Sequence, residues 1–565
     1  MTAPDPAIAY AASNIDGGNP RFLDPATATL AAKDGSPAAW RQAFAETGVG
    51  APRRVHGDFA VGLNLPGGDA FIAVDRFAVR SLCHRVEGGR LLFTDDARKL
   101  AQSPGALDPQ ALFDYLYFHV IPSPRTIYRD VQRLPPAHSA LFHEGKLTIA
   151  PYWRATFEAT GAASFDRLKQ AFRQHLRDAI AAQLDGGRVG CFLSGGTDSS
   201  TVAGMLTQAL GKPAPTFSIG FDADGYDEME YSRIAAQHFS ADHHEYYVTP
   251  ADLVRSIPAV AASFDQPFGN SSVLPTYYCA RLAKDAGIER MLGGDGGDEL
   301  FGGNTRYAKQ RIFGAYGHVP ASLRKGLLEP LLAGDSWATH VPLLRKVASY
   351  VNQARVPMPD RMQSYNLLDR LGLKEVLAPA FLARVDPDAP RRHQRDVWNA
   401  SETPSLVDHM LAFDWRYTLA EADLPKVVGA TRLAGMPVGF PLLDDRLVEF
   451  SMRLPAAYKV RGLKLRWFFK EALRDFLPAQ IITKKKQGFG LPFGVWANRD
   501  AALMRLAADS LRSLGTRGIV RAQFIDAVLK QHLPAHPSYF GELVWIMMML
   551  EQWLLAHAPS YRADD

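Results

Sequence analysis

The sequence predicts an α/β protein with at least two domains, on three observations. Its 565 residues exceed what a single hydrophobic core of ordinary size accommodates. Short β-like runs separated by glycine-rich turns dominate up to about residue 150. Strand and helix patterns then alternate from about residue 164, which is typical of a parallel sheet with helices on both faces. We therefore expect one domain over residues 1–155 and a second over 160–565.

The individual elements follow from local patterns. Tyr152–Ser164 is predicted to be a connector, and the chain beyond about residue 310 is predicted to be mostly helical, with KKKQGFGLPFG as a loop. Residues 165–184 have the 3.6-residue periodicity of an amphipathic helix. The predicted strands are residues 69–77, 89–97, 188–193 and 215–221.

Composition excludes several classes of protein. A hydrophobic content of 47% with 22% charged residues indicates a folded globular chain. The net charge of +4 is small for this length, so we expect no nucleic-acid partner. Cys83, Cys191 and Cys279 lie far apart without metal-ligand spacing, which argues against a disulfide framework or a zinc site.

The chain has no segment typical of secretion or membrane insertion. Its first residues, MTAPDPAIAYAASN, lack a basic segment followed by an apolar run. The most apolar stretch, Leu543–Leu550, is too short to cross a bilayer and is predicted to be a packed helix. We expect a cytoplasmic protein without a membrane partner, and a homodimer stays an open option.

The segment FLSGGTDSS joins a strand ending near Leu193 to a helix beginning near Asp198. Glycine allows unusual backbone dihedrals and a close approach of N–H groups to a ligand, while the helix N-terminus favours an anion. The alternative is an ordinary helix cap after a glycine turn. The turn residues are Ser194, Gly195 and Gly196.

The side chains of this segment also suit a phosphate. Ser194, Ser199 and Ser200 carry hydroxyl groups that donate to phosphate oxygens. Asp198 would repel a phosphate unless a cation lies between them. Because Mg²⁺ takes carboxylate and phosphate oxygens together, Asp198 is a predicted Mg²⁺ ligand.

Two motifs in this order carry a family resemblance. SGGTDSS resembles the pyrophosphate-loop motif of N-type ATP pyrophosphatases, and LGGDGGDELFGG (Leu292–Gly303) resembles the second signature of the asparagine synthetase family. The resemblance implies an N-terminal Ntn-hydrolase-like domain of β-sandwich type and a C-terminal N-type ATP-pyrophosphatase domain. It also implies that ATP and Mg²⁺ are used, that ATP is cleaved between its α and β phosphates, and that AMP is left on a substrate carboxylate.

The resemblance assigns roles to residues by position. Asp298 matches the second Mg²⁺ carboxylate, partner to Asp198, and Lys486 in ITKKKQGFGLPFG matches the catalytic lysine. Asp265, Asn270 and Ser271 match the border of the acceptor pocket, with loop and helix capping as the alternative. The nucleotide-binding positions are Leu193, Ser194, Gly195, Gly196, Asp198, Ser199, Ser200, Ile219, Gly220, Gly293, Gly294, Arg466 and Lys470.

The N-terminal region departs from the family pattern. Glutamine-hydrolysing members carry cysteine directly after the initiator methionine, and this chain has Thr2 there. Residues 57–64, 71–77 and 91–100 still resemble strands of the amidohydrolase fold. We therefore expect a glutaminase-like domain retained as architecture without its nucleophile. An N-terminal threonine nucleophile is the alternative.

A second departure concerns the acceptor pocket. Where asparagine synthetases carry Glu and Arg before a proline, this chain has Pro437 and Gly439, and Val428 replaces an aspartate. The pocket is therefore not expected to suit aspartate. Asp295 stands where asparagine synthetases have Glu and β-lactam synthetases a catalytic Tyr, so it is one candidate to deprotonate the attacking amine.

These observations predict an ATP-dependent amide ligase. It would adenylate a small-molecule or peptide carboxylate for attack by an amine that does not come from glutamine. β-Lactam synthetases and lasso-peptide cyclases of this superfamily likewise lack a working glutaminase, so lactam or macrolactam formation is the expected setting. The alternatives are an ammonia-dependent asparagine synthetase and an ATP-binding scaffold without catalysis.

Overall fold

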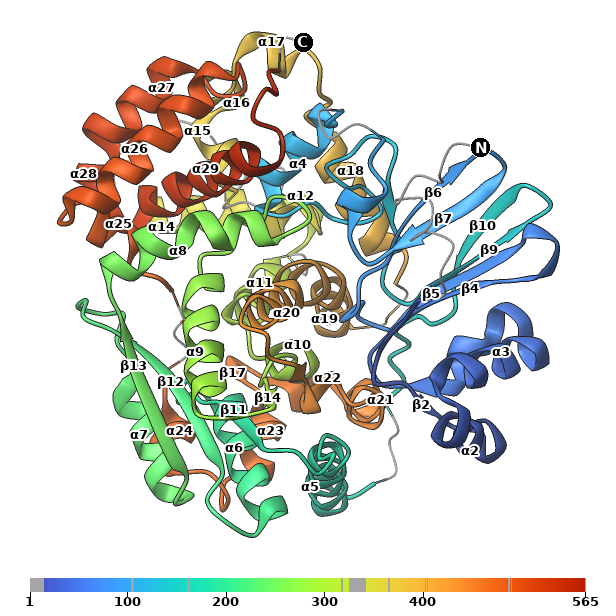
Figure 1. Cartoon of the computed structure of the whole chain (residues 1–565). Helices are drawn as coiled ribbons and strands as arrows, with labels where there is room; N and C mark the ends of the chain where they lie inside the picture. The colour runs from blue at the N-terminus through green and yellow to red at the C-terminus, as the bar shows by residue number, and fades with distance from the viewer. Residues whose placement is uncertain are drawn as a thin grey trace.

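The structure is a computed structural model of the whole chain. It describes residues 15–102, 106–159, 163–316, 319–324, 342–363, 366–401, 403, 405–485, 488 and 490–563. The N-terminal strands lie on one side of the molecule and a parallel sheet on the other, with α19 (Leu406–Asp414) and α20 (Leu424–Leu433) between them (Figure 1). The predicted α/β class is confirmed.

Two sheets pack face to face in the N-terminal region. The larger is fully antiparallel in the order β1-β4-β5-β9-β10, and the smaller has the order β7-β6-β8. Gly62 makes their close approach possible, because a Cβ there would overlap the ring of Phe93. The strands are β1 (Ile15–Gly18), β4 (Phe59–Asn64), β5 (Ala70–Val74), β6 (Cys83–Glu87), β7 (Arg90–Thr94), β8 (Gln132–Arg133), β9 (His138–His143) and β10 (Lys146–Pro151).

This arrangement confirms the predicted sandwich-type domain. The predicted strands at 69–77 and 89–97 are β5 and β7. Apolar residues of both sheets, including Ile72 and Phe93, form the layer between them. The outer face of the larger sheet is covered by α3 (Ser36–Thr47) and a short ribbon of β2 (Arg21–Phe22) and β3 (Val55–His56), with Trp40 of α3 fully buried. Helix α2 (Pro25–Asp34) packs against α3 and β2.

The second region is built on a five-stranded sheet in which every neighbouring pair is parallel, in the order β13-β12-β11-β14-β15. Apolar residues pack α5, α6 and α7 against one face and α9 against the other. These elements are α5 (Phe165–Ala181), β11 (Val189–Phe192), α6 (Thr197–Leu210), β12 (Pro215–Phe221), α7 (Met229–His238), β13 (Asp242–Val248), α9 (Val273–Asp285), β14 (Arg290–Leu292) and β15 (Val438–Gly439).

The strand order places the site. The chain runs outward from β11 to β12 and β13, then crosses back to β14 on the other side of β11. In such open sheets, ligands bind in the crevice beyond the carboxyl ends of the strands where the order reverses. That point lies between β11 and β14, the strands that precede the two sequence motifs.

The described chain beyond residue 310 is mostly helical, as predicted. A hairpin of β16 (Val460–Arg461) and β17 (Lys464–Leu465) interrupts it. The remaining helices are α4 (Pro109–Phe118), α8 (Pro250–Ser263), α10 (Gly297–Phe301), α11 (Thr305–Tyr316), α12 (Ala321–Leu323), α14 (Pro342–Arg355), α15 (Leu367–Leu371), α16 (Leu373–Val376), α17 (Pro379–Leu382), α18 (Ala389–Asn399), α21 (Asp445–Arg453), α22 (Ala456–Lys459), α23 (Trp467–Ala472), α24 (Ala479–Thr483), α25 (Phe493–Ala497), α26 (Ala501–Thr516), α27 (Ala522–Ala527), α28 (Leu533–Ala535) and α29 (Pro537–His557).

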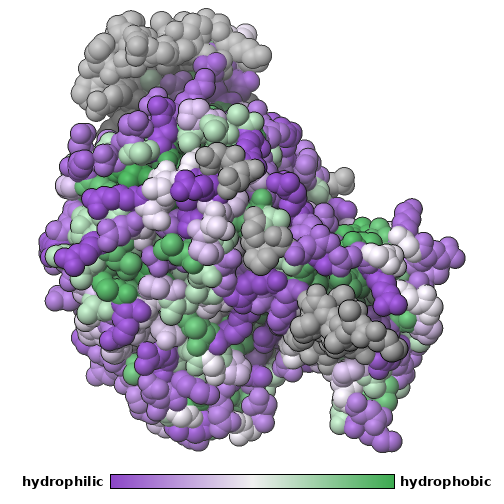
Figure 2. Space-filling view, turned by 45° about the horizontal axis from the view of Figure 1, so that its top comes forward, coloured by the Kyte–Doolittle hydropathy of each residue, from purple (hydrophilic) through white to green (hydrophobic). Residues whose placement is uncertain are grey.

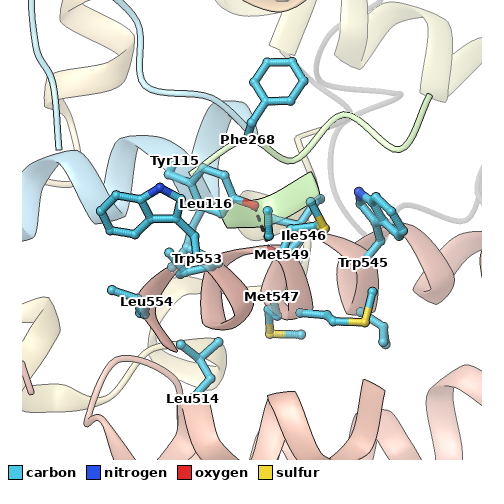
Figure 3. Packing of buried hydrophobic residues seen from close by; sticks show 14 of the residues in the cluster. Tyr115, Leu116, Phe268, Leu514, Trp545, Ile546, Met547, Met549, Trp553 and Leu554 are labelled. Carbon is cyan, nitrogen blue, oxygen red and sulfur yellow. Dashed lines mark hydrogen bonds between the residues drawn. The ribbon is translucent and has the colours of Figure 1, made fainter. Parts of the chain in front are cut away.

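The apolar stretch Leu543–Leu550 lies within α29 and is buried, which confirms the packed-helix prediction. Trp545 and Trp553 of this helix are fully buried, and the hydroxyl of Tyr115 on α4 donates to the carbonyl of Ile546 at 2.8 Å (Figure 3). In the part of the chain that the structure describes, no helix combines the length and apolarity needed to cross a membrane. Polar residues cover most of the face in Figure 2, with apolar residues in patches between them.

Candidate active site

Two loops meet at the carboxyl ends of adjacent strands. Residues 193–196 connect β11 to α6, and residues 293–296 connect β14 to α10. Because β11 and β14 pair in parallel, with Cys191 opposite Leu292, the loops leave the sheet side by side. Both border a cavity of 1040 Å³. The two motifs of the sequence thus form one site.

The first loop curls back onto the N-terminus of α6. Gly195 has a φ of +67°, and a Cβ there would lie 2.5 Å from the backbone nitrogen of Ser232. The Ser199 hydroxyl accepts the Ser194 N–H at 3.2 Å and bonds to the Ser194 hydroxyl at 3.0 Å. The backbone and hydroxyl groups of this loop therefore gather at a helix N-terminus, an arrangement that favours an anion.

Glycines let the second loop press against the first. A Cβ at Gly294 would lie 2.9 Å from the backbone nitrogen of Ser199, and one at Gly297 would overlap the Asp198 carboxylate. Any larger residue would push the two loops apart. The contact between the motifs thus explains the second glycine of each pair in GGDGGD, Gly294 and Gly297.

Arg466 bridges the two predicted metal carboxylates. It caps the N-terminus of α23, its Nη1 lies 2.5 Å from Asp198 Oδ1, and its Nη2 pairs with Asp298 Oδ1. Burial alone would lower the pKa of Arg466, but the two carboxylates raise it above its usual value. Asp198 and Asp298 therefore converge on one cationic position.

This donor set fits Mg²⁺ in combination with a nucleotide. Carboxylate oxygens are the hard ligands that Mg²⁺ prefers, and it commonly takes one or two of them together with substrate phosphates and water. Within the described ranges, no group of three or more Asp, Glu, His or Cys residues is arranged to hold a metal by itself. Phosphate oxygens would complete the coordination.

Lysines line the wall beside Arg466. Lys470 Nζ donates to the carbonyl of Ile482 at 2.7 Å. Lys484 Nζ lies 3.2 Å from Glu228 Oε1 and 4.2 Å from the centre of the Tyr231 ring. Burial lowers the pKa of Lys470 most, and the positive charge of Arg466 lowers it further. These cations face the first loop, where phosphates would lie.

Another part of the cavity wall holds a group of three charged side chains, Asp295, Asp423 and Lys426. Of these, only Asp295 was predicted from the sequence. Lys426 Nζ lies 3.7 Å from Asp295 Oδ1 and 3.3 Å from Asp423 Oδ1. Burial raises the pKa of Asp295, and Lys426 opposes that rise. Burial would lower the pKa of Lys426, but Asp423 and Asp295 raise it overall. In the sequence, the charges of Asp423 and Lys426 three residues apart in DLPK point to this group. Such pairs usually mark a solvated helix face.

The structure gathers most predicted site residues around this cavity. Those that line it are Leu193, Ser194, Gly196, Asp198, Ser199, Ile219, Gly294, Asp295, Asp298, Arg466 and Lys470, together with the acceptor candidate Asn270. Lys486 and Thr2 lie outside the described residues.

Four predicted nucleotide-binding residues lie behind the lining. Gly195 shapes the first loop, as described above, and Ser200 is fully buried in α6. A Cβ at Gly220 would lie 2.6 Å from the Tyr247 ring. The Gly293 N–H donates to the carbonyl of Gly439 at 2.8 Å, which joins β14 to β15.

A second cavity of 730 Å³ lies between the N-terminal strands and α20. Helix α20 contributes to both cavities: Lys426 and Val427 line the first, whereas Val428 and Gly429 line the second. Asp265 and Pro437 also line the second cavity. Val428 and Pro437, which were expected to depart from the family pattern, therefore lie away from the loops, and Ser271 is buried beside Glu542.

Comparison with known proteins identifies the family. Residues 171–555 match the Asparagine synthase family and residues 40–153 the Glutamine amidotransferase domain. Asparagine synthetase [glutamine-hydrolyzing] 1 of Bacillus subtilis is 22% identical over 489 residues, covering 85% of this chain and 74% of the relative. A putative asparagine synthetase [glutamine-hydrolyzing] of Mycobacterium bovis is 24% identical over 541 residues, covering 92% and 80%.

A fungal relative carries a different name. Amidase chyE of Penicillium rubens is 22% identical over 470 residues, covering 75% of this chain and 68% of the relative. The Asparagine synthase match alone spans more than half of the chain. Both motifs of the family lie within this match and meet at one cavity. The chain belongs to the asparagine synthase family of ATP-dependent carbon–nitrogen ligases.

Proposed function

We propose that the chain adenylates a substrate carboxylate with ATP, releases pyrophosphate, and joins the activated acyl group to an amine that does not come from glutamine. The observation that carries this proposal is the convergence of Asp198, Asp298 and Arg466 at the carboxyl ends of β11 and β14. The setting we favour is lactam or macrolactam formation in a biosynthetic pathway.

ATP would lie along the 1040 Å³ cavity. Ser218 and Ile219, in the middle of β12, line this cavity and would border the adenine base. The first loop, Arg466 and Lys470 would hold the β and γ phosphates and stabilise the departing pyrophosphate. Asp198 and Asp298 would hold Mg²⁺, which neutralises negative charge on the triphosphate when bound. Lys486 is proposed to stabilise charge at the α phosphate.

The reaction has two balanced steps. The substrate carboxylate attacks the α phosphorus, the bond to the β phosphate oxygen breaks, and acyl-AMP and pyrophosphate form. The amine then attacks the acyl carbon, AMP leaves, and one proton must be removed from the nitrogen. Asp295, held beside Lys426 and Asp423 at the far end of the cavity, is proposed to accept that proton.

The N-terminal domain supports this choice of amine. Its two packed sheets are present, but residue 2 is Thr2 and not the cysteine expected of glutamine-hydrolysing members. Pro437 and Gly439 stand at the positions where Glu and Arg were expected for asparagine synthesis, and Pro437 lines the second cavity. An amine that arrives with the substrate itself fits both departures.

ATP–pyrophosphate exchange across a panel of carboxylic acids tests the proposal. We expect exchange with at least one acid other than aspartate, without added glutamine. Exchange with aspartate alone would instead indicate an asparagine synthetase that uses free ammonia. ATP binding without exchange for any acid would contradict the catalytic proposal and favour a scaffold role.

A further inference from the structure

We propose that Arg466 is the resident counter-cation of the metal site, so that a divalent cation enters between Asp198 and Asp298 only together with ATP. This inference rests on the proposed metal role of the two carboxylates. It adds an order of binding and assigns Arg466 a positioning role before it contacts any phosphate.

The contacts show one guanidinium shared by two carboxylates from different motifs. Nη1 pairs with Asp198 Oδ1 at 2.5 Å and Nη2 with Asp298 Oδ1. The Arg466 side chain is only 7% exposed, and those of Asp198 and Asp298 are 16% and 15% exposed. Two carboxylates this close and this buried repel each other unless a cation lies between them. Arg466 supplies that cation from within the chain.

The backbone holds Arg466 in this position. Its φ is +50°, an uncommon conformation for a residue with a Cβ. The Arg466 N–H donates to the carbonyl of Gly302 at 3.1 Å, and its own carbonyl accepts the Lys470 N–H at 2.9 Å. Residue 466 is thus fixed at both peptide groups, directly beside the second motif.

Two glycines of the second motif leave room for the same ion pairs. A Cβ at Gly303 would overlap both the Asp298 carboxylate and the Arg466 guanidinium. A Cβ at Gly297 would overlap the Asp198 carboxylate. The chain therefore leaves room for the carboxylate–guanidinium–carboxylate arrangement where any larger residue would disrupt it.

A metal ion and Arg466 compete for the same oxygens. Mg²⁺ requires its ligands at about 2.0–2.1 Å and would face the positive guanidinium directly. Phosphate oxygens offer the guanidinium an equivalent bidentate partner. When the triphosphate arrives, Arg466 transfers to it and the two carboxylates turn to the cation. Metal and ATP consequently enter as one complex.

Binding of Mn²⁺ alone, counted from the electron paramagnetic resonance signal of free Mn²⁺, tests this inference on the full chain. For the wild type without nucleotide we expect no saturable site, and with α,β-methylene-ATP we expect one beyond the Mn²⁺ that the same nucleotide binds without protein. Arg466→Ala without nucleotide should bind Mn²⁺ at least about tenfold more tightly than the wild type, because the guanidinium no longer lies between the two buried carboxylates. Arg466→Lys, with a single ammonium, should lie between them.

Matched variants make the result specific. Arg474→Ala removes another arginine of the same cavity, one that pairs with Glu471, and should leave Mn²⁺ binding as in the wild type. Arg466→Ala with Asp298→Asn should lose the gained site. If Arg466→Ala folds poorly, addition of Mn²⁺ should raise its Tm and leave that of the wild type unchanged.

The outcomes separate this inference from the proposed function. If the wild type without nucleotide binds Mn²⁺ as tightly as Arg466→Ala does, the counter-cation role is overturned and the adenylation proposal still stands. Failure of both Arg466→Ala and Arg466→Lys to gain Mn²⁺ binding would overturn it as well. No Mn²⁺ binding by the wild type even with α,β-methylene-ATP would instead contradict the metal assignment on which both proposals rest.

Discussion

The two cavities on either side of α20 differ in what lines them. The first is bordered by both sequence motifs, with paired carboxylates, Arg466 and Lys470 close together. The second, smaller cavity lies against the N-terminal strands and includes Val428 and Pro437, where the sequence was expected to depart from the asparagine synthetase pattern. Helix α20 thus lies between the two cavities and contributes residues to both.

The difference in lining leads us to assign the proposed activation of the carboxylate to the first cavity. Activation of a carboxylate needs fixed cations and a phosphate loop, and these lie wholly in the first cavity. In the proposed reaction the amine is deprotonated by Asp295, whose Oδ1 lies 3.7 Å from Lys426 Nζ in the wall of the same cavity. Changes in the second cavity should therefore leave activation intact. Four variants test this division.

The largest effect is expected at the paired carboxylates. Asp298→Ala removes one of two proposed metal ligands and leaves Arg466 with a single partner. ATP–pyrophosphate exchange should fall by roughly 10²–10³-fold or more, as when a group that stabilises transition-state charge is removed. Asp166→Ala, an exposed carboxylate paired with Lys169, is the control. Exchange within a few-fold of the wild type for Asp298→Ala would refute the metal assignment.

A loss of about 10-fold to 10²-fold in exchange is expected for Gly303→Ala, because the added methyl group displaces the Asp298 carboxylate and misplaced catalytic groups cost rate steeply. Gly50→Ala is a suitable control, since a Cβ there would meet nothing nearer than 4.0 Å. Circular dichroism should show both variants folded. Normal exchange by Gly303→Ala would mean that the position of the Asp298 carboxylate beside Arg466 does not matter for activity.

A smaller and more selective effect is expected at the acceptor end. Burial raises the pKa of Asp295, and the negative charge of Asp423 raises it further, whereas the positive charge of Lys426 lowers it. The Glu299 carboxylate also acts on Lys426. As a base, Asp295 acts only when ionised, so amide formation should fall as the pH drops through this raised pKa. Lys426→Met should move that fall to higher pH and slow amide formation about tenfold.

The measurement is a pH profile of amide formation beside ATP–pyrophosphate exchange at each pH. Exchange by Lys426→Met should stay near the wild-type level, because adenylation does not use Asp295 as a base. Lys426→Arg, which keeps the charge, should restore most of the profile. Equal losses of exchange and amide formation would assign Lys426 to ATP binding instead.

The smallest effect is expected in the second cavity. Val428→Ala removes two methyl groups from its wall and touches neither motif loop. Exchange should stay within about twofold of the wild type, as for most substitutions away from reacting groups. A loss as large as that of Gly303→Ala would show that the second cavity takes part in activation.

Much of the activation site could be predicted from the sequence, because its glycines, serines and carboxylates are contiguous along the chain. The order of β11, β14 and their loops then follows from the rules of parallel sheets. The bridge made by Arg466 could not be predicted, since residues 198, 298 and 466 are far apart in sequence. The same holds for Lys426, whose partner Asp295 comes from another element, and for Val428, whose side of α20 only packing decides.

The most direct test of the central claim is the identity of the products of ATP. Phosphorus NMR of the wild type, with Mg²⁺ and an acid that supports exchange and without glutamine, should show AMP and pyrophosphate in equal amounts. Asp198→Ala should show neither. ADP and inorganic phosphate as the products would contradict activation by adenylation at the paired loops.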